Sequence, residues 1–189
     1  MGLMKVALHI CCAVCAAGAA ERLIHEGHQV VGFYFNPNIY PPEEYRLRLE
    51  NARKAAEQLT FPLHEGPYQP EDWEKIIAGL ENEPEGGRRC LPCFKMRLEK
   101  TYRFMLDSGC EAFASTLSMG SNKSAALIEQ IGREIGGEAF LSRDFKKKEG
   151  FKRAGELSRQ WGLYRQNYCG CRFSLRDREL RPKAEPKTQ

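Results

Sequence analysis

Short apolar runs alternate along the chain with longer segments in which apolar and polar positions follow a helical period. Residues 5–10 and 29–35 are apolar runs of strand length, and the second is rich in β-branched and aromatic side chains. Between them, residues 15–27 place apolar side chains at helical spacing and end on Gly27, a residue type that commonly terminates helices. These segments predict a strand, a helix and a second strand.

The same alternation continues along the chain. Further strands are predicted over residues 61–65, 111–116 and 138–141. Further helices are predicted over residues 43–59, 70–80, 90–106, 123–136 and 151–162, with a last helical turn or two within 174–181. Strands that alternate with helices predict an α/β fold: one domain over residues 1–180, in three layers around a mostly parallel sheet, followed by a disordered basic tail over 181–189.

Two loops of this predicted fold stand where a ligand is expected. In parallel sheets, ligands bind in the crevice outside the carboxyl ends of the strands. "CCAVC" directly follows the first strand, and "STLSMGSNKS" directly follows a later one, so both loops are predicted to face one crevice. The hydroxyl groups of the second loop suit an anion, although capping of the next helix by Ser121 is an alternative role.

Eight cysteines in 189 residues need an explanation other than disulfide staples, because a chain of this length buries a sufficient core without them. The N-terminal apolar run is interrupted by Lys5 and His9 and is not typical of a signal peptide. No apolar stretch approaches the roughly 18 residues of a membrane span. These features predict a cytoplasmic protein without a membrane partner, in which clustered cysteines bind metal or carry out redox chemistry.

Four of the cysteines form two pairs with the spacing of metal ligands. Cys11 and Cys12 stand where a strand becomes a helix, and Cys90 and Cys93 stand three residues apart at the start of another helix, on one face. Amides at a helix N-terminus favour the thiolate, which is the form that binds metal. Four thiolates hold either a zinc ion or a [4Fe–4S] cluster, and the spacing does not separate these alternatives.

A third pair, Cys169 and Cys171, is separated only by Gly170. Such a pair is either a bidentate metal half-site or a redox dithiol. A disulfide across one residue is strained and therefore easily reduced, as a catalytic couple should be. We interpret the two other cysteines, Cys15 and Cys110, first as small buried side chains.

Other candidates have an ordinary structural alternative. We interpret His9 first as a core histidine, ahead of a ligand or an acid. Asp144 is either a cap or a group that donates a proton or binds iron. Residues 143–189 carry 14 Lys or Arg and 6 Asp or Glu, a net charge of +8, whereas residues 1–142 carry −4. This basic end suits a polyanion such as nucleic acid, or is simply a solvated surface.

The side chains around the third cysteine pair suit a splayed RNA base and its phosphates. The alternative is that they are core aromatics and solvated cations. The candidates are Tyr164, Arg165, Tyr168, Arg172 and Phe173 beside the pair, and Lys146, Lys147 and Lys148 before it.

Four motifs taken together resemble the QueH-type epoxyqueuosine reductases. They are "HICCAVC", "RRCLPCFKMRLEKT", "FASTLSMGSNKS" and "DFKKKEGFKRAGELSRQWGLYRQNYCGCRFS". They occur in the family's order and cover nearly the whole chain up to Ser174. Two departures are small: Val14 stands where many members have proline, and "EGFKRAGELS" replaces a more usual Gly-Gly-Tyr opening.

The resemblance implies an enzyme that reduces the epoxide of epoxyqueuosine to queuosine, at the wobble position of tRNAs with GUN anticodons, on a fold similar to nucleotide α-hydrolase-like domains. It implies that Cys11, Cys12, Cys90 and Cys93 bind a [4Fe–4S] cluster and that Cys169 and Cys171 are a redox-active pair. An additional iron ion and an unidentified electron donor also belong to this expectation.

Two other functions are weighed against it. A zinc-stabilised RNA-binding module would use the same four thiolates without catalysis. An ATP-using tRNA thiolase of similar architecture would need an SGGxDS-like phosphate loop after the first strand, where this chain has "HICCAVC". No GxGxxG follows a strand, so the sequence predicts no nicotinamide or flavin site.

Overall fold

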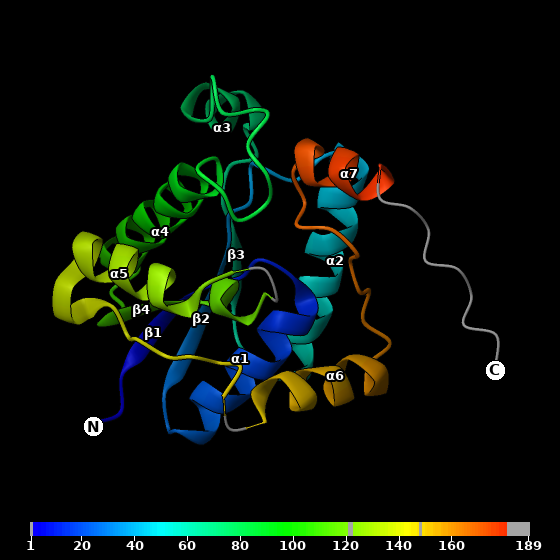
Figure 1. Ribbon diagram of the computed structural model, residues 1–189. Coiled ribbons are helices and arrows are strands. Elements are labelled where there is room, and N and C mark those ends of the chain that lie inside the picture. Colours follow the sequence, from blue (N-terminus) through cyan, green and yellow to red (C-terminus); the bar gives the residue numbers. More distant parts are fainter. Residues whose placement is uncertain (1, 121–122, 148, 181–189) are drawn as a thin grey trace.

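A computed structural model describes residues 2–120, 123–147 and 149–180. Their four strands form one parallel sheet in the order β3-β2-β1-β4. The strands are β1 (Lys5–His9), β2 (Gln29–Tyr34), β3 (Leu63–Glu65) and β4 (Ala112–Ser115). In the register of the sheet, Leu8 lies between Gly32 and Ala114. The predicted parallel α/β fold is confirmed (Figure 1).

The helices follow the predicted order. They are α1 (Ala13–His25), α2 (Pro42–Gln58), α3 (Pro70–Ile76), α4 (Cys90–Asp107), α5 (Ala125–Gly136), α6 (Gly150–Gln160) and α7 (Arg172–Glu179), with short 3₁₀ helices η1 (Thr116–Met119) and η2 (Gly137–Ala139). Ser124 caps α5, because its hydroxyl accepts a hydrogen bond from the amide of Leu127 at 3.3 Å.

The prediction of a strand over residues 138–141 is wrong. That segment makes only an isolated parallel bridge between Phe140 and Phe113. The η2 turn includes Glu138 and Ala139, so too few extended residues remain to form a ladder of backbone hydrogen bonds with β4.

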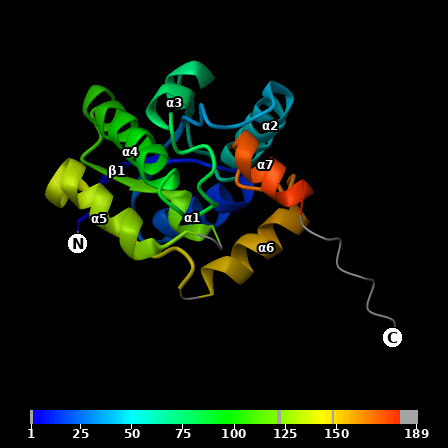
Figure 2. The ribbon, with the colours of Figure 1, turned by 45° about the horizontal axis from the view of Figure 1, so that its top comes forward.

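Two apolar cores lie on opposite faces of the sheet and give the three layers. Alternate residues of a strand point to opposite faces. Val6 and Leu8 therefore pack in one core with α1 and α2, whereas Ala7 packs in the other with Leu98 of α4 and Ile131 of α5. Figure 2 shows α4 and α5 on one side of the sheet and α1, α2 and α6 on the other.

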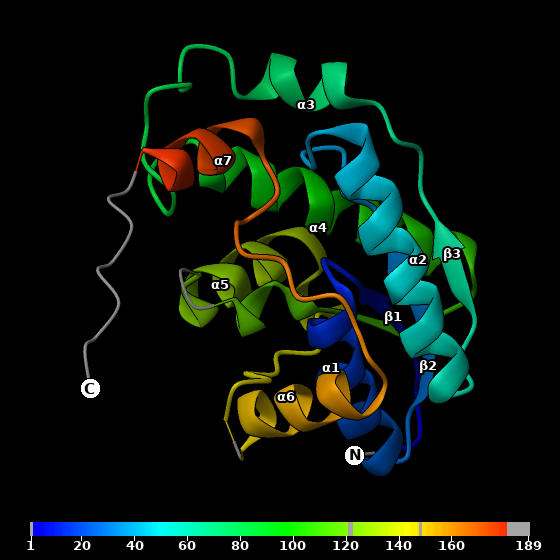
Figure 3. The ribbon, with the colours of Figure 1, turned by 90° about the vertical axis from the view of Figure 1, so that its right-hand side faces the viewer.

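The segment that leads to α7 crosses from α6, past α1 and α2, to the carboxyl ends of the strands (Figure 3). The Tyr164 amide donates a hydrogen bond to Asn51 Oδ1 of α2 at 2.9 Å along the way. There Phe173 of α7 packs with Trp73 of α3 and Cys93 of α4 in a small separate core. This crossing brings the C-terminal cysteines to the strand ends.

Within the part of the chain that the structure describes, no helix combines the length and the apolarity that crossing a bilayer requires. Residues 181–189, predicted to be a disordered tail, lie outside the described residues, as do Ser121 and Lys148.

Candidate metal centre

Three cysteines gather where β1 passes into α1. The sulfur atoms of Cys11, Cys12 and Cys15 all lie within 4.8 Å of one another. Cys12 is the N-cap of α1, and its sulfur accepts a hydrogen bond from the Cys15 amide at 3.4 Å. Thr116, which directly follows the neighbouring strand β4, holds Cys11 in place. Its hydroxyl accepts a hydrogen bond from the Cys11 amide at 3.0 Å and lies 3.2 Å from the Cys11 sulfur.

The three thiols of the trio differ in pKa. Hydrogen bonds from the thiols of Cys12 and Cys15 hold the pKa of Cys11 well below its usual value, against the effect of burial. The same contact with Cys11 raises the pKa of Cys12 to about 12 and raises that of Cys15 well above its usual value. A single thiolate on Cys11, with two thiols donating to it, is therefore the favoured state of the metal-free trio.

Cys15 was interpreted from the sequence as a small buried side chain, but the structure places it, half-buried, in this trio. A signal for it was present. Cys12 and Cys15 stand three apart at a helix start, with the same spacing as Cys90 and Cys93.

The other two cysteine pairs meet each other. Cys93 and Cys171 lie in one core cluster, and Cys90 interacts electrostatically with Cys169, Cys93 and Cys171. Burial raises the pKa of Cys90 to about 11 and also raises that of Cys171. Of the four thiols predicted as one ligand set, Cys11 and Cys12 lie in the trio and Cys90 and Cys93 lie beside the CGC pair.

All eight cysteines are free thiols. The expectation of a disulfide between Cys169 and Cys171 is therefore not supported. The sulfur of Cys171 is used in another way, since Cys171 is the N-cap of α7 and accepts a hydrogen bond from the Ser174 amide at 3.4 Å.

Three helix N-termini thus converge on the thiols: Cys12 caps α1, Cys90 is the first residue of α4, and Cys171 caps α7. The positive end of a helix dipole favours a thiolate over a thiol. Three separate segments of the chain therefore place cysteine sulfurs at helix N-termini, although burial and neighbouring thiols keep the pKa values of Cys12, Cys90 and Cys171 above the usual value.

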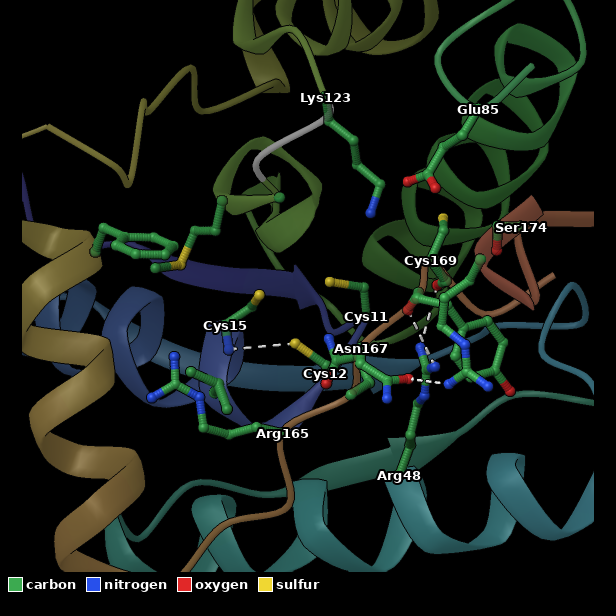
Figure 4. Close-up of a pocket in the computed structure, with 17 residues that line it drawn as sticks. Cys11, Cys12, Cys15, Arg48, Glu85, Lys123, Arg165, Asn167, Cys169 and Ser174 are labelled. Carbon is green, nitrogen blue, oxygen red and sulfur yellow. Dashed lines mark hydrogen bonds between the residues drawn. The ribbon is translucent and has the colours of Figure 1, made fainter. Parts of the chain in front are cut away.

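A cavity of about 300 Å³ opens among these groups and is lined by Cys11, Cys12, Cys15 and Cys169 (Figure 4). Met119, Gly120 and Lys123 also line it, so the two loops predicted to face one crevice do so. The polar and cationic groups around it include Arg48, Lys123, Arg165, Asn167, Tyr168 and Arg178.

Arg48 of α2 holds the CGC loop against the cavity. Its guanidinium donates to the carbonyls of Cys169 at 3.1 Å and Tyr168 at 3.3 Å, and it pairs with Glu44 at 2.7 Å. Gly170 has a φ of +128°, and a Cβ there would lie 3.0 Å from Ile39, so this turn requires glycine. The loop that carries both thiols is therefore firmly placed.

Lys123 reaches from the loop after β4 toward the space between Cys11 and Cys169 (Figure 4). Burial acts to lower the pKa of Lys123, but the thiolate charges of Cys169 and Cys11 outweigh it, so the pKa is raised overall. Lys123 is consequently charged at neutral pH. The sequence motif "STLSMGSNKS" predicted that the loop containing Lys123 faces the crevice, but it did not single out Lys123 itself.

His9 is a core histidine, as interpreted from the sequence. Its Nε2 lies 3.1 Å from the Phe35 carbonyl and its Nδ1 lies 3.1 Å from the Ser115 hydroxyl. Burial, and then the charge of Arg97, lower its pKa to about 3, so the ring is neutral. Because the carbonyl can only accept, Nε2 carries the proton.

Asp144 lies outside the thiol-lined cavity. Its carboxylate accepts a hydrogen bond from the Lys146 amide at 3.1 Å, which is the local capping role that the sequence left open. Cys110 is buried just before β4, at the opposite end of that strand from the thiols, and its sulfur lies 3.3 Å from the hydroxyl of Ser108.

The residues predicted to contact RNA divide into two groups. Arg165 and Tyr168 line the cavity. Phe173, in contrast, is 7% exposed and belongs to the core, and Arg172 pairs with Glu74 at 2.8 Å. The Tyr164 hydroxyl donates to Glu44 at 3.0 Å.

Lys146 and Lys147, the two residues of the predicted lysine run that the structure describes, do not line this cavity. Lys146 donates from Nζ to the Lys123 carbonyl at 3.1 Å, and Lys147 is exposed beside a second cavity.

Residues 6–177 match the family model described as epoxyqueuosine reductase QueH. The chain belongs to this family. A QueH from Acinetobacter baylyi is 34% identical over 177 residues, which cover 92% of this chain and 81% of that relative. The QueH of Thermotoga maritima is 34% identical over 179 residues, covering 92% of this chain and 91% of the relative. The resemblance seen in the sequence motifs is confirmed.

Among solved structures, the U34-tRNA thiolase NcsA from Methanococcus maripaludis, determined with its [4Fe-4S] cluster, has a TM-score of 0.54 to this QueH chain. The two are 14% identical, and the alignment covers 92% of this chain but only 62% of the thiolase chain. At this identity the likeness shows a shared fold.

Proposed function

We propose that the protein reduces the epoxide of epoxyqueuosine, at the wobble position of tRNAs with GUN anticodons, to give queuosine. Family membership supports the activity. The observation that carries the proposal is the convergence of seven thiols, from residues 11–15, 90–93 and 169–171, at three helix N-termini around one end of the sheet. A protein that only bound RNA would not need so many ionisable sulfurs at a cavity.

The proposed cofactor is a [4Fe–4S] cluster, and the donor set fits it because thiolates are its usual ligands. We assign Cys11, Cys12, Cys90 and Cys93 as the ligands, as predicted. The thiolase of similar fold was determined with such a cluster. Binding of the additional iron, which the family resemblance implies, is the alternative to a redox role for Cys169 and Cys171. When bound, the cluster would supply electrons one at a time.

The reaction converts an epoxide to an alkene. Both carbon–oxygen bonds break, a carbon–carbon double bond forms, and the oxygen leaves as water after taking up two electrons and two protons. Oxidation of the Cys169 and Cys171 thiols to a disulfide supplies two electrons and releases two protons, so the equation balances. An external reductant then restores the thiols, which are the state that the structure contains.

Lys123 is the proposed partner of the departing oxygen. It places a positive charge beside Cys11 and Cys169 in the cavity. A fixed cation where negative charge develops stabilises the transition state more than a mobile one in water does. Arg165 and Arg178 at the same cavity suit the phosphates that flank the target nucleotide, and Tyr168 lies among them.

The first test of this proposal is the metal content and spectrum of anaerobically prepared protein. We expect iron and sulfide in the proportion of one [4Fe–4S] cluster per chain, and a broad absorbance at about 400 nm. A colourless protein with one zinc ion per chain would instead support the RNA-binding alternative.

The second test separates the two roles of the CGC pair. Cys169→Ala should keep the cluster spectrum and lose the formation of queuosine from epoxyqueuosine-containing tRNA. A fully active Cys169→Ala would contradict the redox role, and a variant that loses iron would make Cys169 a ligand.

A further inference from the structure

Arg97 is buried in the centre of the thiol region, with 2% of its surface exposed. It lies on α4, one helical turn after Cys93, and its Nε donates to the Cys93 carbonyl at 3.3 Å. Its Nη1 lies 3.3 Å from Oδ1 of Asn36, whose own amide group donates to the Ile10 carbonyl at 2.8 Å. These hydrogen bonds connect the start of α4 with the residue directly before Cys11.

The third nitrogen of this guanidinium has no hydrogen-bond partner among the residues that the structure describes. Nη2 of Arg97 is buried and makes no hydrogen bond within the described residues. Leaving a buried donor unpaired costs roughly 1–3 kcal/mol, and more for a charged group. The packing of the guanidinium against the Phe94 ring, 5.7 Å from its centroid, compensates only part of the lost hydration.

The charges that act on Arg97 are sulfurs. Cys93, Cys169, Cys11 and Cys90 are the groups that most strongly raise the pKa of Arg97 against the effect of burial, ahead of any carboxylate. Arg48, a buried arginine that lines the cavity, has a carboxylate as its partner instead, because Glu44 lies 2.7 Å away. Arg97 is therefore a buried cation whose strongest electrostatic neighbours are cysteine sulfurs, which carry negative charge when they bind a metal.

We infer that Arg97 is a positioning residue for the iron–sulfur cluster: it joins the two cysteine-bearing segments, balances the negative charge of the metal-bound thiolates, and donates its unpaired Nη2 to sulfur. The inference rests on the proposed function only in requiring a cluster. It holds whichever of the thiols are the ligands, because Arg97 interacts with sulfurs of all three segments.

The expected effect on the cluster has a definite sign. A reduced cluster carries one more negative charge than an oxidised one, so a neighbouring cation and an N–H···S hydrogen bond favour the reduced form. Removing them should lower the midpoint potential. We expect Arg97→Gln to shift the ratio of reduced to oxidised cluster at a fixed potential at least tenfold toward oxidised, which is about 59 mV for one electron.

The experiment is an anaerobic redox titration of wild-type protein, Arg97→Gln and Arg97→Lys, followed by electron paramagnetic resonance and combined with iron and sulfide analysis. Arg103→Gln is the matched control, because Arg103 lies on the same helix, carries the same charge and is exposed. Arg103→Gln should keep the wild-type potential, and Arg97→Lys should lie between wild type and Arg97→Gln. An Arg97→Gln cluster with the wild-type potential overturns the inference.

If Arg97→Gln takes up no cluster, circular dichroism of the apoproteins shows whether Arg97 positions the cluster or only stabilises the fold. A folded Arg97→Gln that does not bind the cluster, beside a folded Arg97→Lys that binds less iron than wild type, supports the positioning role. If the apoproteins of both variants are unfolded, Arg97 only stabilises the fold, and the positioning inference is overturned. A wild-type protein that takes up no iron–sulfur cluster would contradict the proposed function itself, and this inference falls with it.

Discussion

At the scale of single residues, the thiol region depends on buried charges. Arg48 shows this best, because it is 2% exposed and yet pairs with Glu44 and holds the carbonyls of Tyr168 and Cys169. Burying a guanidinium is costly unless its donors are satisfied. The position of the CGC loop is thus linked to an ion pair on α2.

Replacing Arg48 by methionine should destabilise the protein by about 3–5 kcal/mol, because the partly buried Glu44 carboxylate then loses its cationic partner. The free energy of unfolding in urea, measured without oxygen, checks this. Arg46→Met on the same helix is the control. Arg46 is exposed and pairs with exposed Glu43 at 3.5 Å, so its loss should cost less than about 0.5 kcal/mol. Equal effects of the two substitutions would contradict the role given to Arg48.

The cluster ligands can be separated by substitution of single cysteines. Cys90→Ser should lose the iron–sulfur cluster, whereas Cys15→Ser should retain it. The reason is that Cys90 belongs to the proposed set of four cluster ligands, whereas Cys15 does not. Iron and sulfide counts for the two variants check this. Loss of the cluster in Cys15→Ser, with retention in Cys90→Ser, would make the trio the ligand set.

At the scale of elements, the sequence pattern predicted what depends on local periodicity. The α4 helix was predicted over residues 90–106 and observed as Cys90–Asp107, because its apolar face is continuous. Residues 138–141 failed as a strand, since a run of only three apolar residues does not distinguish a ladder from a single bridge. The start of α1 lies two residues before the prediction because the Cys12 thiol acts as its cap, a use of cysteine that composition rules do not anticipate.

The crossing of α1 and α6 gives a prediction at this scale. A Cβ on Gly18 of α1 would lie 2.8 Å from the Cβ of Ala154 on α6, so Gly18→Ala should force the helices apart and cost about 1–3 kcal/mol. Gly155→Ala is the matched change on α6, where the nearest atom to a new Cβ is 3.7 Å away. There alanine's better helix propensity should stabilise the fold by about 0.5–1 kcal/mol. Thermal unfolding should show opposite signs, and two changes of the same sign would contradict this packing.

At the scale of the whole molecule, the site is assembled from segments far apart in the sequence. The clustering of cysteines and the rule for strand ends located the crevice. They did not show that the CLPC and CGC pairs lie together, because this depends on how residues 163–171 cross the sheet end. Arg97 and Lys123 were missed for a related reason. Their importance lies in what surrounds them in space, and a basic residue in an amphipathic helix or a polar loop has an ordinary sequence signature.

The activity itself is the most direct test of the account. Cluster-loaded protein, kept without oxygen, is incubated with dithionite and a tRNA that carries epoxyqueuosine, and the nucleosides are then measured by mass spectrometry. The account predicts that epoxyqueuosine disappears and queuosine, lighter by one oxygen atom, takes its place. The Lys123→Met variant should be at least tenfold slower, whereas Lys100→Met, at an exposed position on α4, should keep the wild-type rate. Unchanged epoxyqueuosine in the presence of wild-type protein with its full iron and sulfide content would contradict the account.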